Sequence, residues 1–346
     1  MYKVSIITVT LNSEKTILDT LNSAINQTCK NIEHIFVDGG SNDNTIKILK
    51  KYPFENKKII IKKNSTIYEA INIGIKNSTG HIISILNSDD FYNNSGILEK
   101  IYKEFKENKT TDVISGNVIY FRNNKFNKIT RYYKASDFKI KEIYLGMMPP
   151  HTGTFIKKSI YNKYGLYNEK YKIASDYDYF VKIFKKKINY HRVNYVTTRM
   201  RAGGISGKSI ISNIQSSLEI VNSLKENQIK QNPLKILSRF LKKFHQLYEF
   251  NTDFINRDFE IKYHPIYKNQ IGEDFKILLK TQKIFNFEKF IFSAMNLAFL
   301  GSFIQGFIKK HEYQVNWPDG IFSKIFDLKI KKKTWKINFV ANTKLY

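Results

Sequence analysis

The sequence predicts an α/β fold in which a Rossmann-like, mainly parallel sheet carries helices on both faces. A mostly helical C-terminal region is expected to follow this sheet. Short apolar runs alternate with helix-like segments from residue 1 to about 205, which is the spacing of βαβ units. The nearly all-apolar run 82–86 is typical of a strand buried on both faces. Beyond about residue 205 strand signals become few, and residues 206–250 and 271–310 have helical patterns.

The first elements follow one another at short intervals. The helix that follows the first strand places its apolar residues on one face, and Ser13 is a plausible N-cap for it. Gly80 is expected to end the last helix of the series as a C-cap. The predicted strands are 4–9, 32–37, 58–62 and 82–86, and the predicted helices are 13–25, 44–51 and 67–77.

Composition sets limits on the class of protein. The single cysteine, Cys29, excludes an internal disulfide framework and a cysteine-based zinc cluster, so a reducing cytoplasm fits. The chain starts directly in a strand-like run, without the long apolar core of a signal peptide. Its formal charge of +27 predicts attraction to nucleic acid, an anionic membrane or anionic substrates. The Lys- and Asn-rich composition also fits a biased genome without functional demand.

Two segments of the tail bear on membrane contact. Residues 239–244 form an amphipathic basic stretch. The segment Phe290 to Ile308 has no charged residue, and basic residues flank it. Its length is near the lower limit for a spanning helix, but polar residues and glycines dilute it. A buried helix, an interfacial helix and a spanning helix all remain open for this segment.

Adjacent carboxylates follow the apolar strand 82–86, at Asp89 and Asp90. Ligands of open α/β sheets bind at the carboxyl ends of the strands. Two neighbouring acids repel each other, and a divalent cation that holds a diphosphate would keep both ionised. The alternative is that one of them is a helix N-cap, because Asp accepts well from free N–H groups.

Polar segments also follow the first two strands. Thr8, Thr10 and Asn12 lie at the end of the first strand, and Asp38 opens a turn after the second. The two glycines after Asp38 permit a tight turn and close approach to a ligand. Asp38 is placed to accept hydrogen bonds from a base or a ribose. No P-loop or G-x-G-x-x-G motif is present, which disfavours ordinary ATPases and dinucleotide enzymes.

A later acid, Asp176, precedes a helix-like segment. It fits a general base that takes a proton from a sugar hydroxyl, and it also fits a helix N-cap. Further along, Arg199 and Arg201 precede a Gly-Gly pair in a loop suited to cover a diphosphate leaving group.

In this order the motifs resemble those of the family-2 inverting glycosyltransferases of the GT-A fold. The resemblance is nearest to the branch of bacterial colanic-acid and capsule glycosyltransferases. It covers residues 1 to about 206, and the chain beyond about 210 matches no named family. The matching segments are 4–12, 37–43, 67–75, 86–90, 150–155, 176–180 and 203–206.

The resemblance implies roles for individual residues. Asp38 would bind the nucleoside, Asp89 the ribose or the metal, Asp90 the metal that bridges the diphosphate, and Asp176 would be the catalytic base. Asp90 is expected to hold more of the metal than Asp89. The rest of the expected nucleotide-sugar site consists of Thr8, Thr10, Asn12, Asn72 and Arg201. Residues expected to line the site or contact the acceptor are Tyr68, Glu69, His151, Asp178 and Ser206.

Three departures from the family pattern concern the site directly. Many relatives carry two acids where this chain has Asp38 and Gly39. Asn87 replaces the first acid of the common metal motif, and Ser175 replaces the usual Glu before the base. The first departure bears on base recognition and the second on metal ligation.

The resemblance implies a metal-dependent hexosyl- or N-acetylhexosaminyl-transferase that requires Mn²⁺ or Mg²⁺. The donor would be a nucleotide-diphosphate sugar, with UDP favoured, and the acceptor a lipid-linked or growing capsule, lipopolysaccharide or exopolysaccharide. Residues 1–210 would form the catalytic domain. The segment from about 110 to 150 and the tail would set acceptor specificity.

The basic, helical residues 211–346 have two interpretations. They would hold a cytoplasmic enzyme on the anionic inner face of the cytoplasmic membrane, or form a packed helical subdomain. A basic nucleic-acid-binding protein and a non-catalytic scaffold remain alternatives for the whole chain. The sequence has no helix-turn-helix, zinc-finger or RNP-type motif, so no specific nucleic acid is predicted. It gives no indication of oligomeric state.

Overall fold

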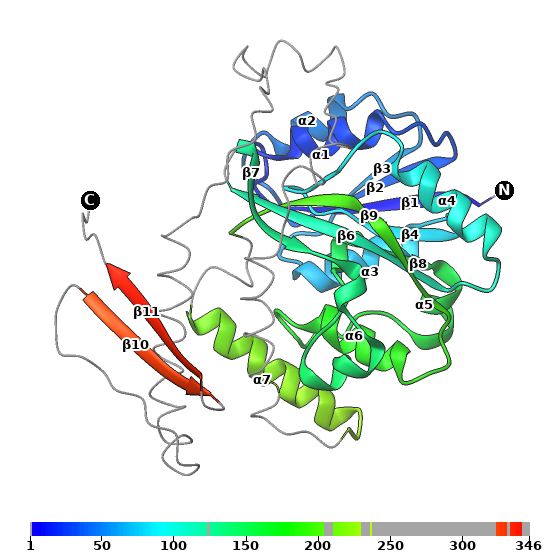
Figure 1. The fold of residues 1–346 in the computed structure, drawn as a ribbon. Helices are drawn as coiled ribbons and strands as arrows, with labels where there is room; N and C mark the ends of the chain where they lie inside the picture. Colours follow the sequence, from blue (N-terminus) through cyan, green and yellow to red (C-terminus); the bar gives the residue numbers. More distant parts are fainter. Residues whose placement is uncertain are drawn as a thin grey trace. The chain divides into compact units, whose positions relative to one another are not determined.

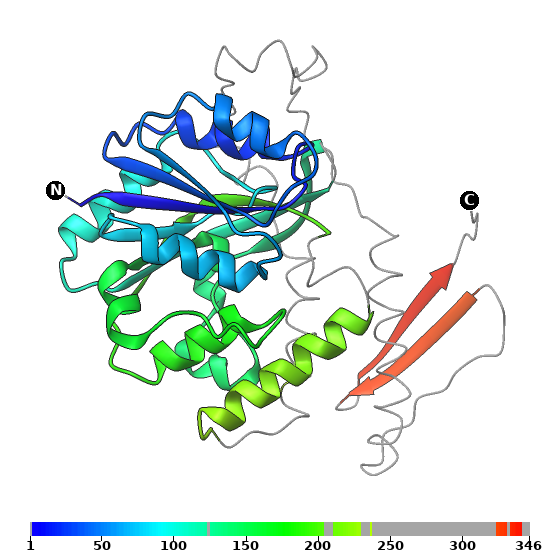
Figure 2. The ribbon, with the colours of Figure 1, turned by 180° about the vertical axis from the view of Figure 1, so that it is seen from behind.

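The computed structural model describes residues 2–122, 125–203, 210–229, 236, 323–330 and 333–340. The chain divides into two units, residues 1–281 and 282–346. In the first unit a nine-stranded sheet lies between helices on both faces (Figure 1; the reverse view is Figure 2). The predicted α/β fold is therefore confirmed.

The N-terminal half of the sheet is parallel. Its strands lie in the order β3-β2-β1-β4, and the register places Thr10 beside Asp38. Parallel pairing brings the carboxyl ends of these strands to one edge, as the motif positions require. Their bounds are β1 (Val4–Thr10), β2 (Ile32–Asp38), β3 (Lys57–Ile61) and β4 (Ile82–Ile85).

The second half of the sheet is mixed, whereas the sequence indicated a mainly parallel sheet. β8 lies antiparallel between β4 and β6, β9 is parallel to β6, and β5 and β7 pair antiparallel with β9 and β6. Antiparallel neighbours need no crossover helix, so the strand–helix alternation fades here. The bounds are β5 (Phe91–Tyr92), β6 (Val113–Arg122), β7 (Lys125–Tyr133), β8 (Thr154–Lys157) and β9 (Tyr190–Arg201).

Successive residues of β1 point to opposite faces of the sheet, and each face has its own helices. Ile6 packs in the core formed with α4, and Ile7 in the core formed with α3 and α6. The first face carries α1 (Ile17–Ile25), α2 (Thr45–Lys51) and α4 (Ile97–Glu107). The second carries α3 (Ile67–Asn77), α5 (Lys158–Tyr164) and α6 (Ser175–Phe184), and three 3-10 turns are η1 (Ala135–Asp137), η2 (Ile140–Leu145) and η3 (His151–Gly153).

Two predicted helix ends, the start of α1 and the C-cap of α3, differ from those in the structure. α1 begins at Ile17 rather than near Ser13, whose carbonyl accepts the N–H groups of Thr16 and Ile17 in a turn. Helix α3 has the predicted bounds, but its C-cap is Ser78, not Gly80. Gly80 lies where a Cβ would be 2.4 Å from the hydroxyl oxygen of Ser5, so it is required for close approach to β1.

The described residues beyond 205 comprise α7 (Ile210–Glu226), which packs on α6, and, in the second unit, a hairpin of β10 (Ser323–Ile330) and β11 (Lys333–Val340). This hairpin was not predicted from the sequence, which indicated a mostly helical region. Residues 239–244 and 290–308 lie outside the described part of the chain. Within the described part, no helix is both long and apolar enough to cross a membrane.

Candidate active site

The loop after β2 is organised by the side chain of Asp38. This carboxylate is fully buried and accepts four hydrogen bonds from its own chain. They come from the hydroxyl of Thr10 at 2.7 Å, the N–H of Gly40 at 2.9 Å, and the N–H and hydroxyl of Ser41, both at 2.7 Å. Gly40 has a φ of 96°, which favours glycine. Asp38 therefore shapes the loop that follows β2.

Of the three residues predicted for the site at the end of β1, Thr10 and Asn12 contact the loop after β2, but Thr8 does not. Asn12 has a φ of 50° and joins the neighbouring loop, since its side-chain oxygen accepts the N–H of Asn42 at 2.9 Å. Thr8 is fully buried, with its hydroxyl 2.9 Å from a ring nitrogen of His34. Thr8 is therefore a core residue, which disagrees with its predicted place in the site.

The two adjacent acids differ in exposure. Asp90 is 1% exposed, and its two carboxylate oxygens accept the backbone N–H of Arg201 at 3.0 Å and the side-chain amide of Asn87 at 2.9 Å. Burial raises the pKa of Asp90 well above its usual range, and the charge of Asp89 raises it further. Asp89 is half-buried. Neither acid caps a helix, because α4 starts at Ile97 after Gly96.

These acids are suited to a cation that is shared with a substrate. Among the described residues, no group of three or more His, Cys, Asp or Glu side chains comes together to hold a metal ion. Mg²⁺-type sites commonly use one or two carboxylates together with substrate phosphates. The donor set fits such an ion: Asp89 is the more exposed acid, whereas both carboxylate oxygens of Asp90 accept hydrogen bonds from the protein.

Arg201 lies at the same strand end as the acid pair. Its guanidinium is 2.7 Å from the carboxylate of Asp19 on α1 and stacks over the ring of Phe121, 4.9 Å from the centroid. Burial raises the pKa of Asp19 from 3.8 to about 6, and the charge of Arg201 opposes this shift. Arg201 thus places a cation beside Asp90. Ser206 lies outside the described residues.

Asp176 lies in the first turn of α6. The N-cap of this helix is Ala174, so the N-cap interpretation of Asp176 is wrong. Its carboxylate accepts the N–H of Tyr177 at 2.8 Å and lies 3.3 Å from the hydroxyl of Tyr68, which also donates to the carbonyl of Ile173 at 2.6 Å. Burial raises the pKa of Asp176 above its ordinary value, whereas the charge of His151 lowers it. The pKa of Asp176 is therefore set by burial and by two neighbouring side chains, His151 and Tyr68.

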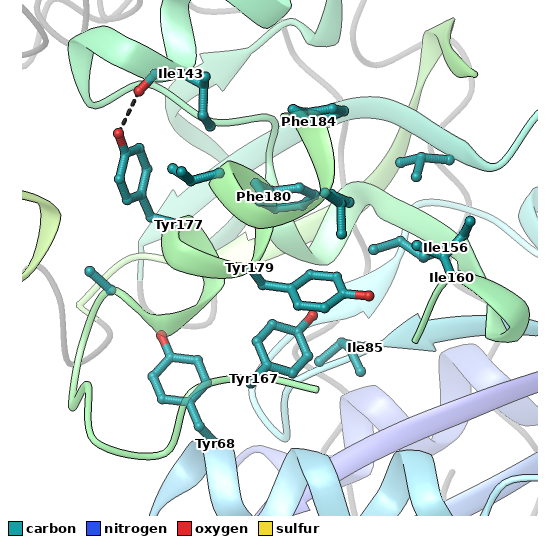
Figure 3. Packing of buried hydrophobic residues seen from close by; sticks show 14 of the residues in the cluster. Tyr68, Ile85, Ile143, Ile156, Ile160, Tyr167, Tyr177, Tyr179, Phe180 and Phe184 are labelled. Atoms are coloured by element: carbon teal, nitrogen blue, oxygen red, sulfur yellow. Dashed lines mark hydrogen bonds between the residues drawn. The ribbon is translucent and has the colours of Figure 1, made fainter. Parts of the chain in front are cut away.

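Aromatic side chains connect Asp176 to His151. Figure 3 shows Tyr68 and Tyr167 side by side; their rings stack with centroids 5.9 Å apart. The hydroxyl of Tyr167 is 2.9 Å from a ring nitrogen of His151. Burial lowers the pKa of His151, and the charge of Asp176 opposes that shift. His151 and Tyr68 thus belong to the surroundings of Asp176.

Three other predicted residues make hydrogen bonds that hold the fold together. Asn72 is buried and bonds the backbone N–H and carbonyl of Tyr167 and the side chain of Glu169. Glu69 completes a capping box at the start of α3. Asp178 accepts from Ser223 at 2.6 Å and Asn227 at 3.3 Å, so it faces the region of α7. Asn72 and Asp178 bond other elements of the fold, and such contacts cannot be read from sequence motifs.

Two residues near the acids were not predicted from the sequence, Tyr120 and its neighbour Arg131. Burial raises the pKa of Tyr120 on β6, the charge of Arg131 lowers it, and the charges of Asp90 and Asp176 raise it, so Tyr120 feels both acids. The guanidinium of Arg131 on β7 stacks over this tyrosine, 4.9 Å from its ring centroid. The available signal was their place in the 110–150 segment, which was expected to set acceptor specificity.

The fold and site define an α/β enzyme with acidic groups at the carboxyl edge of its sheet. The chain belongs to glycosyl transferase family 2, whose sequence profile matches residues 5–193. It is a glycosyltransferase, which disfavours the nucleic-acid-binding and scaffold alternatives.

The chain is similar in sequence to a biosynthetic glycosyltransferase and to a synthase. A PGL/p-HBAD biosynthesis glycosyltransferase of Mycobacterium bovis is 27% identical over 183 residues, which cover 52% of this chain and 69% of that protein. The hyaluronan synthase of Pasteurella multocida is 30% identical over 229 residues, which cover 62% of this chain but only 23% of the synthase.

Solved structures support the same fold at low sequence identity. S. aureus TarS 1-349 in complex with UDP-GlcNAc has a TM-score of 0.52 and 20% identity, with 70% of this chain and 72% of that chain covered. The mannosyltransferase PcManGT of Pyrobaculum calidifontis, in complex with GDP-Man and Mn²⁺, has a TM-score of 0.52 and 17% identity, with 71% and 72% covered.

Proposed function

We propose that this enzyme transfers a sugar, with inversion, from a UDP-sugar to a hydroxyl of a lipid-linked or growing cell-surface glycan. The observation that carries the proposal is the setting of Asp176 within the family-2 domain. This acid is half-buried at the start of α6, and Tyr68 and His151 adjoin it. A raised pKa in such a setting suits a general base.

The donor is assigned to the edge formed by β1, β2 and β4. The loop shaped by Asp38, together with Thr10 and Asn12, would receive the nucleoside. The UDP-GlcNAc complex of TarS supports a UDP-sugar by analogy of fold, and the name of the hyaluronan synthase supports a polysaccharide product.

A divalent cation, Mn²⁺ or Mg²⁺, would supply positive charge to the departing diphosphate. Asp89 would hold it, while buried Asp90 would fix the backbone of Arg201 and the amide of Asn87. Arg201 would add a second positive charge to the same diphosphate. The Mn²⁺ complex of the Pyrobaculum mannosyltransferase supports this choice of ion by analogy.

The chemical step follows from the position of Asp176. As the acceptor oxygen forms a bond to the anomeric carbon, the bond from that carbon to the diphosphate oxygen breaks. The hydroxyl proton passes to the carboxylate of Asp176, and the electron pair of the broken bond leaves with the nucleoside diphosphate. Attack opposite to the leaving group inverts the anomeric configuration.

The proposal of a lipid-linked acceptor at a membrane surface is supported by the net charge of the chain and by its relatives. The net charge of +27 supports association with an anionic membrane surface, where a lipid-linked acceptor would be presented. The mycobacterial relatives are named for PGL/p-HBAD biosynthesis, which is compatible with such an acceptor. The site of action would then be the inner face of the cytoplasmic membrane.

The experiment compares Asp176→Asn with a control on the same helix, Asp178→Asn. The first change removes the base and should lower kcat by roughly 10²–10⁴-fold, with the donor Kd nearly unchanged. The control should keep its activity, because one amide oxygen can accept both hydrogen bonds that Asp178 receives at a single oxygen. Donor binding is measured by calorimetry and transfer by release of nucleoside diphosphate. Wild-type turnover in Asp176→Asn would overturn the assignment.

A further inference from the structure

The carboxylate of Glu219 on α7 binds three consecutive backbone N–H groups. Glu219 is 8% exposed and lies outside the family-matched residues 5–193. One of its oxygens accepts the N–H of Ile173 at 2.9 Å and that of Ala174 at 2.8 Å. The other accepts the N–H of Lys172 at 3.1 Å and the side-chain amide of Gln215 at 3.0 Å. A buried carboxylate is thereby satisfied entirely by donors.

These N–H groups belong to the segment that delivers Asp176. Ala174 is the N-cap of α6, and Asp176 follows two residues later. The carbonyl of Ile173, within the same segment, accepts the hydroxyl of Tyr68, which also lies 3.3 Å from Asp176. Hydrogen bonds to a charged acceptor are about twice as strong as neutral ones. Glu219 therefore holds the backbone segment that accepts the Tyr68 hydroxyl and leads into Asp176.

Other contacts dock α7 against the same region. Ser223 donates to Asp178 on α6 at 2.6 Å, and Glu226 pairs with Lys170 at 2.6 Å in the preceding loop. Apolar residues of α7, Ile220 and Leu224, belong to the core that contains α6. These contacts make α7 part of the catalytic unit, so the predicted domain boundary at residue 210 falls before a helix that the site uses.

We propose that Glu219 is a positioning residue for Asp176. It holds residues 172–174 so that Tyr68 and the acid keep their relative positions. This inference rests on the proposed role of Asp176 as the base. Because the geometry of a near-attack arrangement is sensitive to small displacements, loss of this anchor should reduce kcat more than it reduces donor binding.

The pH dependence gives a readout that a purely structural role would not move. The groups that face Asp176 are Tyr68 from α3, His151 from η3, Tyr120 from β6 and Tyr167 from the loop before α6. Of these, Tyr68 is tied to the segment that Glu219 holds. The Tyr68 hydrogen bond lowers the pKa of Asp176, so losing it should raise that pKa. The acid limb of kcat should then move to higher pH.

The test uses Glu219→Gln in the full chain, with Glu226→Gln as the matched control. Gln at 219 can still accept from Ile173 and Ala174, but its amide hydrogens would face the donors of Lys172 and Gln215. The control removes the same charge from the same helix. The side chain of Glu226 is 43% exposed in its ion pair with Lys170. For both variants and for Asp176→Asn, we would measure kcat across pH, the melting temperature, and the number of donor-binding sites by calorimetry.

We expect Glu219→Gln to lower kcat per donor-binding site by roughly 10–100-fold, with the acid limb shifted upward. Glu219→Asp, which keeps the charge, should recover part of this loss, and Glu226→Gln should resemble wild type. A kcat per site and a pH profile equal to those of wild type would overturn the inference. A fall in activity that merely follows the fraction of folded protein would overturn it as well. If Asp176→Asn is itself active, the proposed function fails instead.

Discussion

Replacement of Asn72 by alanine tests whether this residue binds nucleotide, as its motif suggests, or anchors a loop, as its contacts indicate. Asn72 is 2% exposed and makes three hydrogen bonds of 2.8–3.0 Å to Tyr167 and Glu169. At about 1 kcal/mol each, their loss costs about 3 kcal/mol. Alanine recovers roughly 0.5 kcal/mol through helix propensity, so the free energy of unfolding should fall by about 2–3 kcal/mol.

Urea unfolding measures this change, and calorimetry with UDP measures nucleotide affinity in the folded variant. The Kd for UDP should stay within about threefold of wild type, a difference of less than 1 kcal/mol. Asn77→Ala on the same helix is the control, because among the described residues its side chain bonds the carbonyl of Ile73 and the exposed amine of Lys58. Unchanged stability in Asn72→Ala, combined with a tenfold weaker affinity for UDP, would refute the anchoring role.

Two further predictions concern the acid pair and Asp19. Asp89→Asn should weaken Mn²⁺-dependent UDP binding by at least about tenfold, because the ion would lose a charged ligand. Asp90→Asn should mainly lower the melting temperature, because Arg201 and Asn87 donate to different oxygens of Asp90 and an amide has only one oxygen. Calorimetry and melting curves measure both variants, and the opposite ranking would assign the ion to Asp90. Asp19 has a folded pKa of about 6, above its unfolded value, so folded protein binds this proton more tightly and stability is lost as pH rises from about 4 to 6. The unfolding free energy of Asp19→Asn relative to wild type should therefore grow by about 2–3 kcal/mol between pH 4 and pH 7, and a difference that shrinks would show that the Arg201 ion pair outweighs burial.

Short-range patterns predicted much of the N-terminal half. The apolar run at 82–86 and the helix at 67–77 are local features, since burial on both faces and helical periodicity are written in neighbouring residues. The mixed half of the sheet was not predicted, because β8 is inserted between β4 and β6 out of sequence order. Such pairing depends on which strand edge is available, and no local pattern records that.

The sequence by itself determined the order of the motifs and hence the family. Only the tertiary structure decided which acids are buried and what they bind. Asp89 and Asp90 are neighbours with the same chemistry, yet the N–H of Arg201, 111 positions away, engages Asp90. Likewise Tyr68 reaches Asp176 across 108 positions, and Glu219 reaches Ala174 across 45. Burial and hydrogen-bond partners arise from packing between distant segments, so they set the pKa and orientation of each acid only once the chain has folded.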